Sequence, residues 1–549
     1  MSETLDAPAA RSSALMGLGT LTSRITGVLR TAAVIAAIGF GPFADTYSVA
    51  NTLPNVLYLL LVGGAINAVF VPQLVRALSN ADGGRAYTDR LLTVVGLLLI
   101  AITLLGVLLA PWIVGLYAPE NWSADDRATA VLFARFLLPQ VLFYGAFTMA
   151  GQVLNARERF TLPMFAPAAN NLVVIVVALL FLAITAGTPT SATVTFSQVA
   201  LLGAGTTVGI AVQALLLIAV LPRAGYRFRP RFDWRGHGLA KAGGLASWTL
   251  GLVLVNQVAA LVIIRLAAAA NVATTDAGGI SVGVTSYQNA YLVLLLPHGI
   301  IAVSLITAML PRMSRAAAGA DLPAVAGMTS ATVRASLAFM IPSAGILILL
   351  AVPIAELLFG RGAATPAEAA LTGVLLQILL LALVPLSVFG ILQRMYYAIE
   401  DTRTPFLFAV LLSCVQLGVG VGLYTLAAPE LQVAMLAIGT STSFTVAAVL
   451  MWVAAARRLG GLPTRSVVRI AGRSLLATGV AVALGLGVNL LWPVAPAWLR
   501  IIVVGGVCIL TYIVAAHLLR IDEIRAGIVL IGRRLRPIAR LRRIGGPGR

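Results

Sequence analysis

The stretch LLTVVGLLLIAITLLGVLLAPWIVGLY, residues 91–117, contains no charged side chain. A bilayer core about 30 Å thick is crossed by roughly 20 apolar residues of helix, so this stretch predicts a membrane-spanning helix. The rest of the chain has the same character, because 60% of its 549 residues are hydrophobic and only 10% are charged. Soluble proteins carry about 25% charged residues. The composition therefore excludes a water-soluble multidomain protein and predicts an all-α polytopic membrane protein.

Fourteen stretches are long and apolar enough to cross the bilayer. They cover residues 15–39, 47–75, 91–117, 129–154, 163–186, 196–221, 243–268, 281–310, 333–359, 366–393, 405–427, 431–456, 473–493 and 497–519. With a cytoplasmic N-terminus, 31 of the 38 basic residues fall on the inside, whereas Arg127, Arg361 and Arg500 fall outside. Cytoplasmic loops are enriched in Lys and Arg. This alternation predicts fourteen helices with both termini cytoplasmic.

The net charge of +19 is spread over short loops and does not form one contiguous patch. We therefore expect no nucleic-acid partner. The longest basic segments are the loop 223–242 and the tail 520–549. Basic segments beside membrane helices are attracted to anionic lipids, so these two are predicted to contact anionic membrane lipids.

Two six-helix lobes are predicted from a repeat in the polar interruptions. Leu53-Pro54-Asn55 recurs as Leu296-Pro297-His298, and Val71-Pro72 recurs as Leu310-Pro311, at nearly constant offset. Both repeats begin on the cytoplasmic side, so a pseudo-twofold axis along the membrane normal relates them, as in alternating-access transporters. The predicted order is a cytoplasmic segment (1–14), the N-lobe with helices 1–6 (15–222), the basic loop (223–242), the C-lobe with helices 7–12 (243–458), helices 13–14 (459–519) and the basic tail (520–549).

Four arginines lie inside apolar spans, where a charge costs about 2.5–3.5 kcal/mol on insertion scales and indicates a functional role. Arg135 and Arg265 lie near the outer ends of their helices, and we expect them to reach the head groups. Arg24 and Arg30 lie deeper, in a span that also carries Ser23 and several threonines. They predict a wet cavity with an anion site that opens to the cytoplasm. The alternative is that they reach the interface and bind backbone carbonyls.

Amide and phenol groups interrupt spans 2 and 8. Asn51, Asn55 and Tyr58 follow one another at helical spacing and share a face. Gln288 and Asn289 lie ahead of the proline in span 8. These groups suit a ligand rich in hydroxyls and amides, such as a sugar or peptide. The alternative is interhelical hydrogen bonding, worth about 0.6 kcal/mol per pair.

Catalytic and metal-binding motifs are missing from the sequence. It contains no GxxxxGK[ST] phosphate loop, no HExxH and no carboxylate pair, and its three histidines are scattered. We therefore expect a transporter without a hydrolytic or synthetic active site, without a metal and without a cofactor. The membrane potential or an ion gradient is expected to drive it, and the sequence does not identify the ion.

Several motifs together resemble the MurJ/MviN family of lipid II flippases, in the MOP exporter superfamily. They are Ser23-Arg24-Ile25-Thr26-Gly27-Val28-Leu29-Arg30, Gly39-Phe40-Gly41, Leu53-Pro54-Asn55, Ala68-Val69-Phe70-Val71-Pro72, Gln152-Val153-Leu154-Asn155-Ala156, Tyr396-Tyr397-Ala398 and Asp401-Thr402-Arg403-Thr404-Pro405. The resemblance covers about residues 15–520. It implies a bacterial plasma-membrane protein that carries lipid II, the undecaprenyl-pyrophosphate-linked peptidoglycan precursor, from the inner to the outer leaflet. The remaining alternatives are an exporter of another polyprenyl-linked glycan and a non-transporting scaffold for cell-wall synthesis.

The resemblance also implies roles for single residues. Arg24 and Arg30 match arginines of the family's cationic cavity, and Asp45 matches an acidic residue at its outer end. Spans 13 and 14 are implied to form a groove for the polyprenyl tail, and cell-wall synthesis proteins are possible partners. Charged positions of the family are occupied here by uncharged residues, namely Tyr58, Gly63, Tyr291, Leu292 and Leu295.

Overall fold

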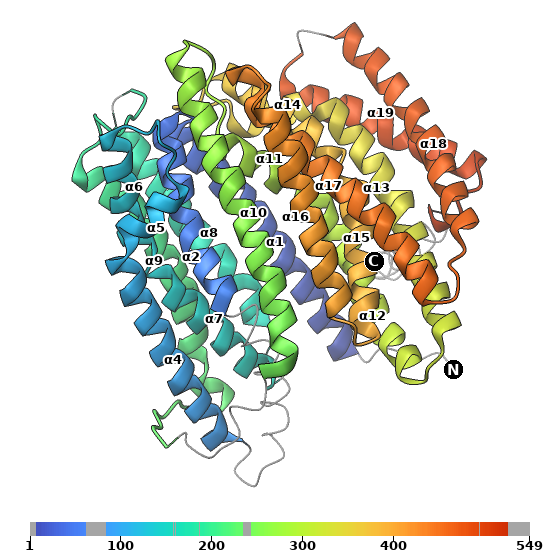
Figure 1. The fold of residues 1–549 in the computed structure, drawn as a ribbon, viewed down its shortest axis with the longest axis horizontal. Helices are drawn as coiled ribbons and strands as arrows, with labels where there is room; N and C mark the ends of the chain where they lie inside the picture. Colours follow the sequence, from blue (N-terminus) through green and yellow to red (C-terminus); the bar gives the residue numbers. More distant parts are fainter. Residues whose placement is uncertain are drawn as a thin grey trace, which may run out of the picture. The chain divides into compact units, whose positions relative to one another are not determined.

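The computed structural model describes residues 7–61, 84–157, 159, 161–185, 187–233, 243–492 and 495–524. Every regular element within these residues is a helix (Figure 1). The helices are α1 (Ala7–Ile38), α2 (Pro42–Leu61), α4 (Arg85–Leu108), α5 (Ala110–Tyr117), α6 (Ala124–Leu137), α7 (Gln140–Asn155), α8 (Thr161–Ile184), α9 (Phe196–Val220), α10 (Gly243–Asp276), α11 (Val284–Pro297), α12 (Val303–Ala318), α13 (Leu322–Phe359), α14 (Pro366–Leu380), α15 (Leu383–Ala398), α16 (Arg403–Tyr424), α17 (Pro429–Arg458), α18 (Thr464–Leu491) and α19 (Ala497–Leu518). The predicted all-α membrane fold is confirmed.

Twelve helical segments in the described part of the chain are long and apolar enough to cross a membrane. The bent pair α14 and α15 raises this number to 13. The predicted second span, 47–75, is described only as far as Leu61 at the end of α2. The count of fourteen therefore stays a prediction.

Several predicted spans are broken where the backbone loses a hydrogen-bond donor. Pro111 lies in the first turn of α5, and Pro139 precedes α7. A proline has no N–H and collides with the preceding turn, so a helix kinks or ends there. After Pro297, α11 continues as a π-helical turn, His298–Ala302, before α12. The pair α14 and α15 bends by 47°, and Pro385 lies in the first turn of α15.

The chain folds as two compact units. The first comprises residues 1–289, 358–369 and 424–433, and the second comprises the remaining residues. In the first unit, Leu91, Val95 and Leu99 of α4 pack on Val141 and Met149 of α7. The predicted lobe boundaries, at residues 15–222 and 243–458, stay a prediction, because the units follow helix contacts and not the repeat.

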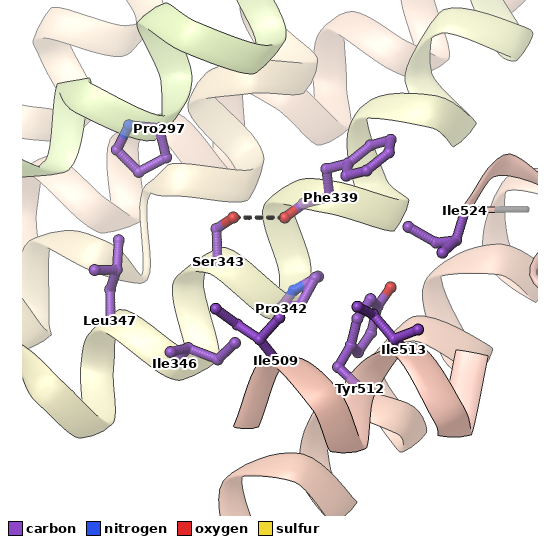
Figure 2. Close-up of a pocket in the computed structure, with 10 residues that line it drawn as sticks. All are labelled: Pro297, Phe339, Pro342, Ser343, Ile346, Leu347, Ile509, Tyr512, Ile513 and Ile524. Carbon is purple, nitrogen blue, oxygen red and sulfur yellow. Dashed lines mark hydrogen bonds between the residues drawn. The ribbon is translucent and has the colours of Figure 1, made fainter. Parts of the chain in front are cut away.

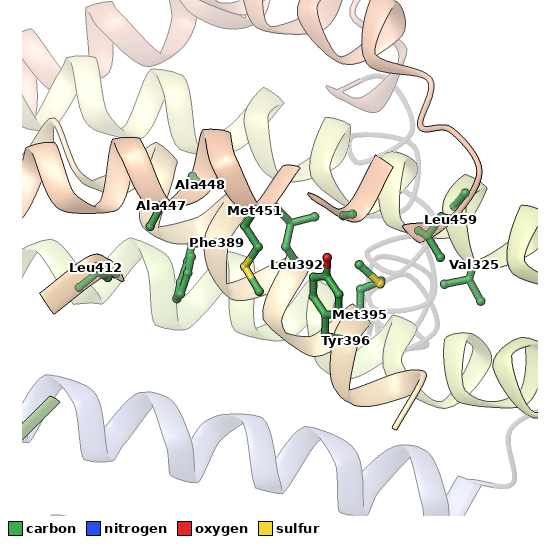
Figure 3. Close-up of a cluster of buried hydrophobic side chains, with 12 residues drawn as sticks. Val325, Phe389, Leu392, Met395, Tyr396, Leu412, Ala447, Ala448, Met451 and Leu459 are labelled. Carbon is green, nitrogen blue, oxygen red and sulfur yellow. The ribbon is translucent and has the colours of Figure 1, made fainter. Parts of the chain in front are cut away.

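The second unit is built around the long helix α13. It packs on α19 beside an apolar pocket (Figure 2). It also packs on α15 and α17 through a cluster of buried apolar side chains, including Phe389, Leu392 and Met451 (Figure 3). A third cluster joins α13 and α18 to α19 and the residues after it, among them Ile521 and Ile524. The predicted helices 13 and 14, α18 and α19, are therefore integral to this unit.

Candidate functional site

Asp45, in the first turn of α2, is completely buried and caps another helix. Its carboxylate accepts hydrogen bonds from the Thr285 N–H at 2.8 Å, the Thr285 hydroxyl at 2.9 Å and the Val284 N–H at 3.2 Å. The Asn271 amide of α10 donates a fourth bond, at 2.8 Å. A negative charge is favoured at a helix N-terminus, where backbone N–H groups lack partners. Asp45 thus joins α2 to α10 and to the start of α11.

Gly283 makes this close approach possible. A Cβ at position 283 would collide with the Asp45 carboxylate and the Asn271 amide. The Asn271 amide also donates to the carbonyl of Phe40, at 3.0 Å. The carboxylate therefore depends on a residue without a side chain directly before α11.

Two further contacts at this end of the first unit tie α10 to α5 and Ala363 to α1. The Arg265 guanidinium of α10 donates to the carbonyls of Gly115 and Leu116, at 3.3 and 3.2 Å, where α5 ends. The N–H of Ala363 donates to the carbonyl of Ala36 in α1, at 2.7 Å. We call this end, held by Asp45, Arg265 and Ala363, the closed end. The Arg265 guanidinium therefore binds carbonyls near a helix end, and its expected contact with lipid head groups stays a prediction.

The predicted amides of span 8 take part in helix packing. The side chain of Gln288 donates to the hydroxyl of Thr52 in α2, at 3.1 Å. The Asn289 amide donates to the carbonyl of Thr285, one turn earlier, at 2.6 Å. The Ser48 and Thr285 hydroxyls are 2.8 Å apart. In this structure both predicted substrate residues of α11 are therefore bound to neighbouring helix atoms.

Arg24 and Arg30 lie on different sides of α1. Six helical residues separate two positions by about 9 Å along the axis and by about 120° around it. Both side chains are partly exposed, while Leu18, Ile25 and Leu29 form an exposed apolar stripe. The positive charge of Arg30 acts on the hydroxyls of Tyr47 and Tyr144. The two arginines thus offer two successive cationic positions.

The hydroxyl groups of α1 are satisfied locally. Thr22 donates to the carbonyl of Leu18, and Thr26 donates to that of Thr22, at 2.9 and 2.8 Å. The Asn171 amide of α8 donates to the Ser23 carbonyl and the Thr26 hydroxyl, at 3.1 and 3.0 Å. Threonine bonds of this kind commonly occur inside helices. Because these hydroxyls are bound to neighbouring helix atoms, only the arginines indicate a water-filled site.

Tyr58 of α2 and Tyr144 of α7 form an aromatic pair. The Tyr58 and Tyr144 ring centroids are 5.6 Å apart, with the rings tilted by 44°. The Tyr58 and Thr148 hydroxyls are hydrogen-bonded at 2.6 Å. Asn51 is partly exposed and Asn55 exposed, on the face of α2 that carries Tyr58. Tyr144 and Thr148 were not predicted, although their spacing of one turn in an apolar span was a usable signal.

Besides Tyr58, four positions carry an uncharged residue where the family has a charged one. Tyr291, Leu292 and Leu295 are partly exposed on α11. Gly63 lies outside the described residues. Within the part of the chain that the structure describes, no group of three His, Cys, Asp or Glu side chains is placed to hold a metal ion.

The second unit contains an apolar pocket of about 470 Å³ (Figure 2). Its lining comes mainly from α13 and α19, with Phe339, Ile346, Ile509 and Ile513 among its side chains. The one hydroxyl of α13 in the lining, that of Ser343, donates to the carbonyl of Phe339, at 2.7 Å. The pocket therefore presents an almost wholly apolar surface, suited to a hydrocarbon chain.

The start of the basic loop, residues 222–233, lies across α4 as a strap. The Tyr226 hydroxyl donates to the Asp89 carboxylate at 2.6 Å, and the Arg231 N–H donates to the Thr93 hydroxyl at 3.0 Å. Burial and the Asp89 carboxylate raise the pKa of Tyr226, so its hydroxyl remains a donor. Asp233 forms an ion pair with Arg90. The arginine side chains of the strap are exposed; they are Arg223, Arg227, Arg229 and Arg231.

In sequence, this chain is similar to lipid II flippases. The family described as lipid II flippase MurJ matches residues 34–505. A probable lipid II flippase MurJ from Rhizobium meliloti is 29% identical over 449 residues, which are 80% of each chain. The lipid II flippase MurJ of Burkholderia cenocepacia is 27% identical over 397 residues, 71% of this chain and 73% of that one.

Solved structures show the same fold. A lipid II flippase MurJ in an inward closed conformation superposes with a TM-score of 0.72 at 20% identity, covering 93% of this chain and 99% of that chain. An inward-facing multidrug resistance MATE transporter of the MOP superfamily superposes with a TM-score of 0.61 at 14% identity, covering 79% of this chain and 94% of that chain.

Proposed function

This chain belongs to the lipid II flippase MurJ family, and we propose that it carries undecaprenyl-pyrophosphate-linked peptidoglycan precursor from the inner to the outer leaflet by alternating access. The observation that carries the proposal is the family match over residues 34–505. The chain is a multi-pass membrane protein and a transporter. The proposal includes three further points: the chain has no active site, both of its termini are cytoplasmic, and it binds cell-wall synthesis proteins.

The pyrophosphate is the part of the substrate that needs cationic partners. Arginine binds phosphate oxygens with a planar, two-pronged group. With the start of α1 cytoplasmic, Arg24 lies nearer the entrance and Arg30 nearer the closed end. Their offset along α1 favours two successive contacts for one moving anion over a single shared site.

The closed end supplies the outer gate of this mechanism. Asp45, Asn271 and Thr285 hold α2, α10 and α11 together there. In a chain with a cytoplasmic N-terminus, α1 ends and α2 begins on the outer side. Release of the head group outward then requires these hydrogen bonds to break.

The apolar pocket between α13 and α19 suits the polyprenyl tail, as the family resemblance implies. We expect Ile346→Trp, which fills this pocket, to weaken binding of undecaprenyl lipid II about tenfold, or about 1.4 kcal/mol, a loss comparable to two buried methylene groups. A short-chain analogue of lipid II should bind the variant unchanged. Affinities are measured for both ligands on purified protein in nanodiscs.

Ile502→Trp is the matched control, because Ile502 is an exposed residue of α19 outside the pocket lining. Equal losses for the long and the short ligand in Ile346→Trp would reject the pocket as the tail site.

The strap supplies the proposed contact with anionic lipids. It begins where α9 ends and presents four exposed arginines, together with Phe228 and Phe232. A basic surface beside a membrane helix is attracted to anionic head groups, with about 1 kcal/mol for each basic residue near the surface.

The proposed function is tested in spheroplasts depleted of this chain, with an impermeant enzyme that cleaves externally exposed lipid II. We expect lipid II to accumulate in a protected form, and expression of the wild-type chain to restore cleavage. Cleavage that continues after depletion in cells without a second flippase would favour the scaffold alternative.

A further inference from the structure

Tyr58 and Tyr144 form a fixed aromatic wall on the first unit. The hydrogen bond between Tyr58 and Thr148, at 2.6 Å, holds one ring by its hydroxyl. The second ring contacts the first with centroids 5.6 Å apart. Both side chains remain partly exposed, so the wall is not closed off by neighbouring helices.

The wall lies within electrostatic reach of a cation. The charge of Arg30 acts on the hydroxyls of Tyr144 and Tyr47. The Tyr47 hydroxyl is itself hydrogen-bonded to that of Thr206, at 3.0 Å. Within the described part of the chain, Arg30 forms no ion pair with a carboxylate. Its charge is available to a ligand that reaches the wall.

The surroundings of the wall are polar. Asn55 is exposed on the same face of α2 as Tyr58, three residues away. Exposed amide groups and an arginine within membrane helices are expensive against lipid, so this face lies against water or a polar ligand. Ligand sites commonly combine aromatic walls with a few polar groups that fix orientation.

We infer that Tyr58 and Tyr144 bind the sugar ring next to the pyrophosphate, while Arg30 binds the anion. The inference rests on the proposed function and names a recognition element within it. The C–H groups of a pyranose ring pack on an aromatic face, and Asn55 offers donors and an acceptor for its hydroxyl and acetamido groups.

The position of the wall indicates which part of the head group binds there. A sugar attached directly to the pyrophosphate reaches a ring within the electrostatic range of Arg30, whereas the peptide begins farther along the head group. An organic cation would also suit an aromatic wall, but the positive charge of Arg30, which acts on Tyr144, disfavours it.

The experiment compares two ligands that share tail and anion and differ in the sugar. Full-length protein in nanodiscs is titrated with lipid II and with undecaprenyl pyrophosphate. We expect Tyr144→Ala to weaken lipid II binding about tenfold and to leave undecaprenyl pyrophosphate within about twofold of wild type. Tyr144→Leu, which keeps apolar bulk without a flat face, should behave alike, and Tyr144→Phe should bind both ligands normally. Phe143→Ala, the neighbouring partly exposed aromatic of α7, is the matched control.

Arg30→Ala separates this inference from the proposed function, because it should weaken both ligands. Unchanged lipid II binding in Tyr144→Ala and Tyr144→Leu, or equal losses for both ligands, would overturn the sugar wall and leave the anion site standing. Retention of both ligands by Arg30→Ala would instead count against the anion site.

Discussion

Arg30→Ala abolishes the capacity of this chain to sustain growth in cells depleted of their own lipid II flippase, while the variant still inserts in the membrane. This outcome is expected because Arg30 is a membrane-helix cation whose charge acts on Tyr47 and Tyr144 and which has no carboxylate partner among the described residues. Losing a charge-assisted contact costs about 1.5–3 kcal/mol, so transport should fall by roughly 10- to 150-fold. Arg30→Lys keeps the charge without the planar group, and we expect partial activity.

Arg135→Ala is the matched control, since Arg135 is exposed in the last turn of α6. Growth and the cleavage of external lipid II are measured together, with membrane insertion checked by immunoblot. Arg24→Ala should resemble Arg30→Ala, because the two arginines are proposed to meet the anion in turn. Normal growth of both variants would remove the anion site from the mechanism.

Asp45→Ala is expected to open the closed end and to stop transport. The substitution leaves two N–H groups at the start of α11 and the Asn271 amide without their carboxylate. Leaving a buried hydrogen-bond donor without its acceptor costs about 1–3 kcal/mol. A shift of this size moves a two-state equilibrium by about 5- to 150-fold. We expect the variant to populate a form open at this end.

The opening is measured with Ser286→Cys, placed at a completely buried position of α11. Cys414 and Cys508 are replaced so that an impermeant thiol reagent reports only on position 286. Labelling should rise at least tenfold in Asp45→Ala. Gly283→Ala should give the same rise, because its Cβ displaces the carboxylate, whereas Gly41→Ala meets no atom within 4 Å and is the control. Protection in both Asp45→Ala and Gly283→Ala would show that Asp45 does not hold this end closed.

The sequence predicts the membrane helices well because the length of an apolar stretch is a property of consecutive residues. The break between α6 and α7 at Pro139 and the π-helical turn after Pro297 were not predicted, since a proline inside a long span can also be accommodated by a simple kink. The bend before Pro385 was missed for the same reason.

In the candidate site, too, features of consecutive residues could be predicted, whereas features that depend on packing could not. Arg24 and Arg30 could be found because charges within apolar spans are rare. Tyr144 was missed, because tyrosine is tolerated in a membrane helix; its one-turn spacing from Thr148 was a weak signal, and its pairing with Tyr58 depends on the packing of α2 on α7. Asp45 was identified by resemblance, whereas its partner Asn271 lies 226 residues away and no local pattern predicts that contact.

The strap on α4 limits the length of chain that is free to connect the two sequence repeats. Twenty residues, 223–242, were predicted to link them, but those up to Asp233 are held by Asp89, Thr93 and Arg90. Ten residue steps remain between Asp233 and the start of α10, and they extend at most about 35 Å. A short tether keeps two bodies at a high effective concentration, so every excursion of α10 away from α4 is bounded and its return is favoured.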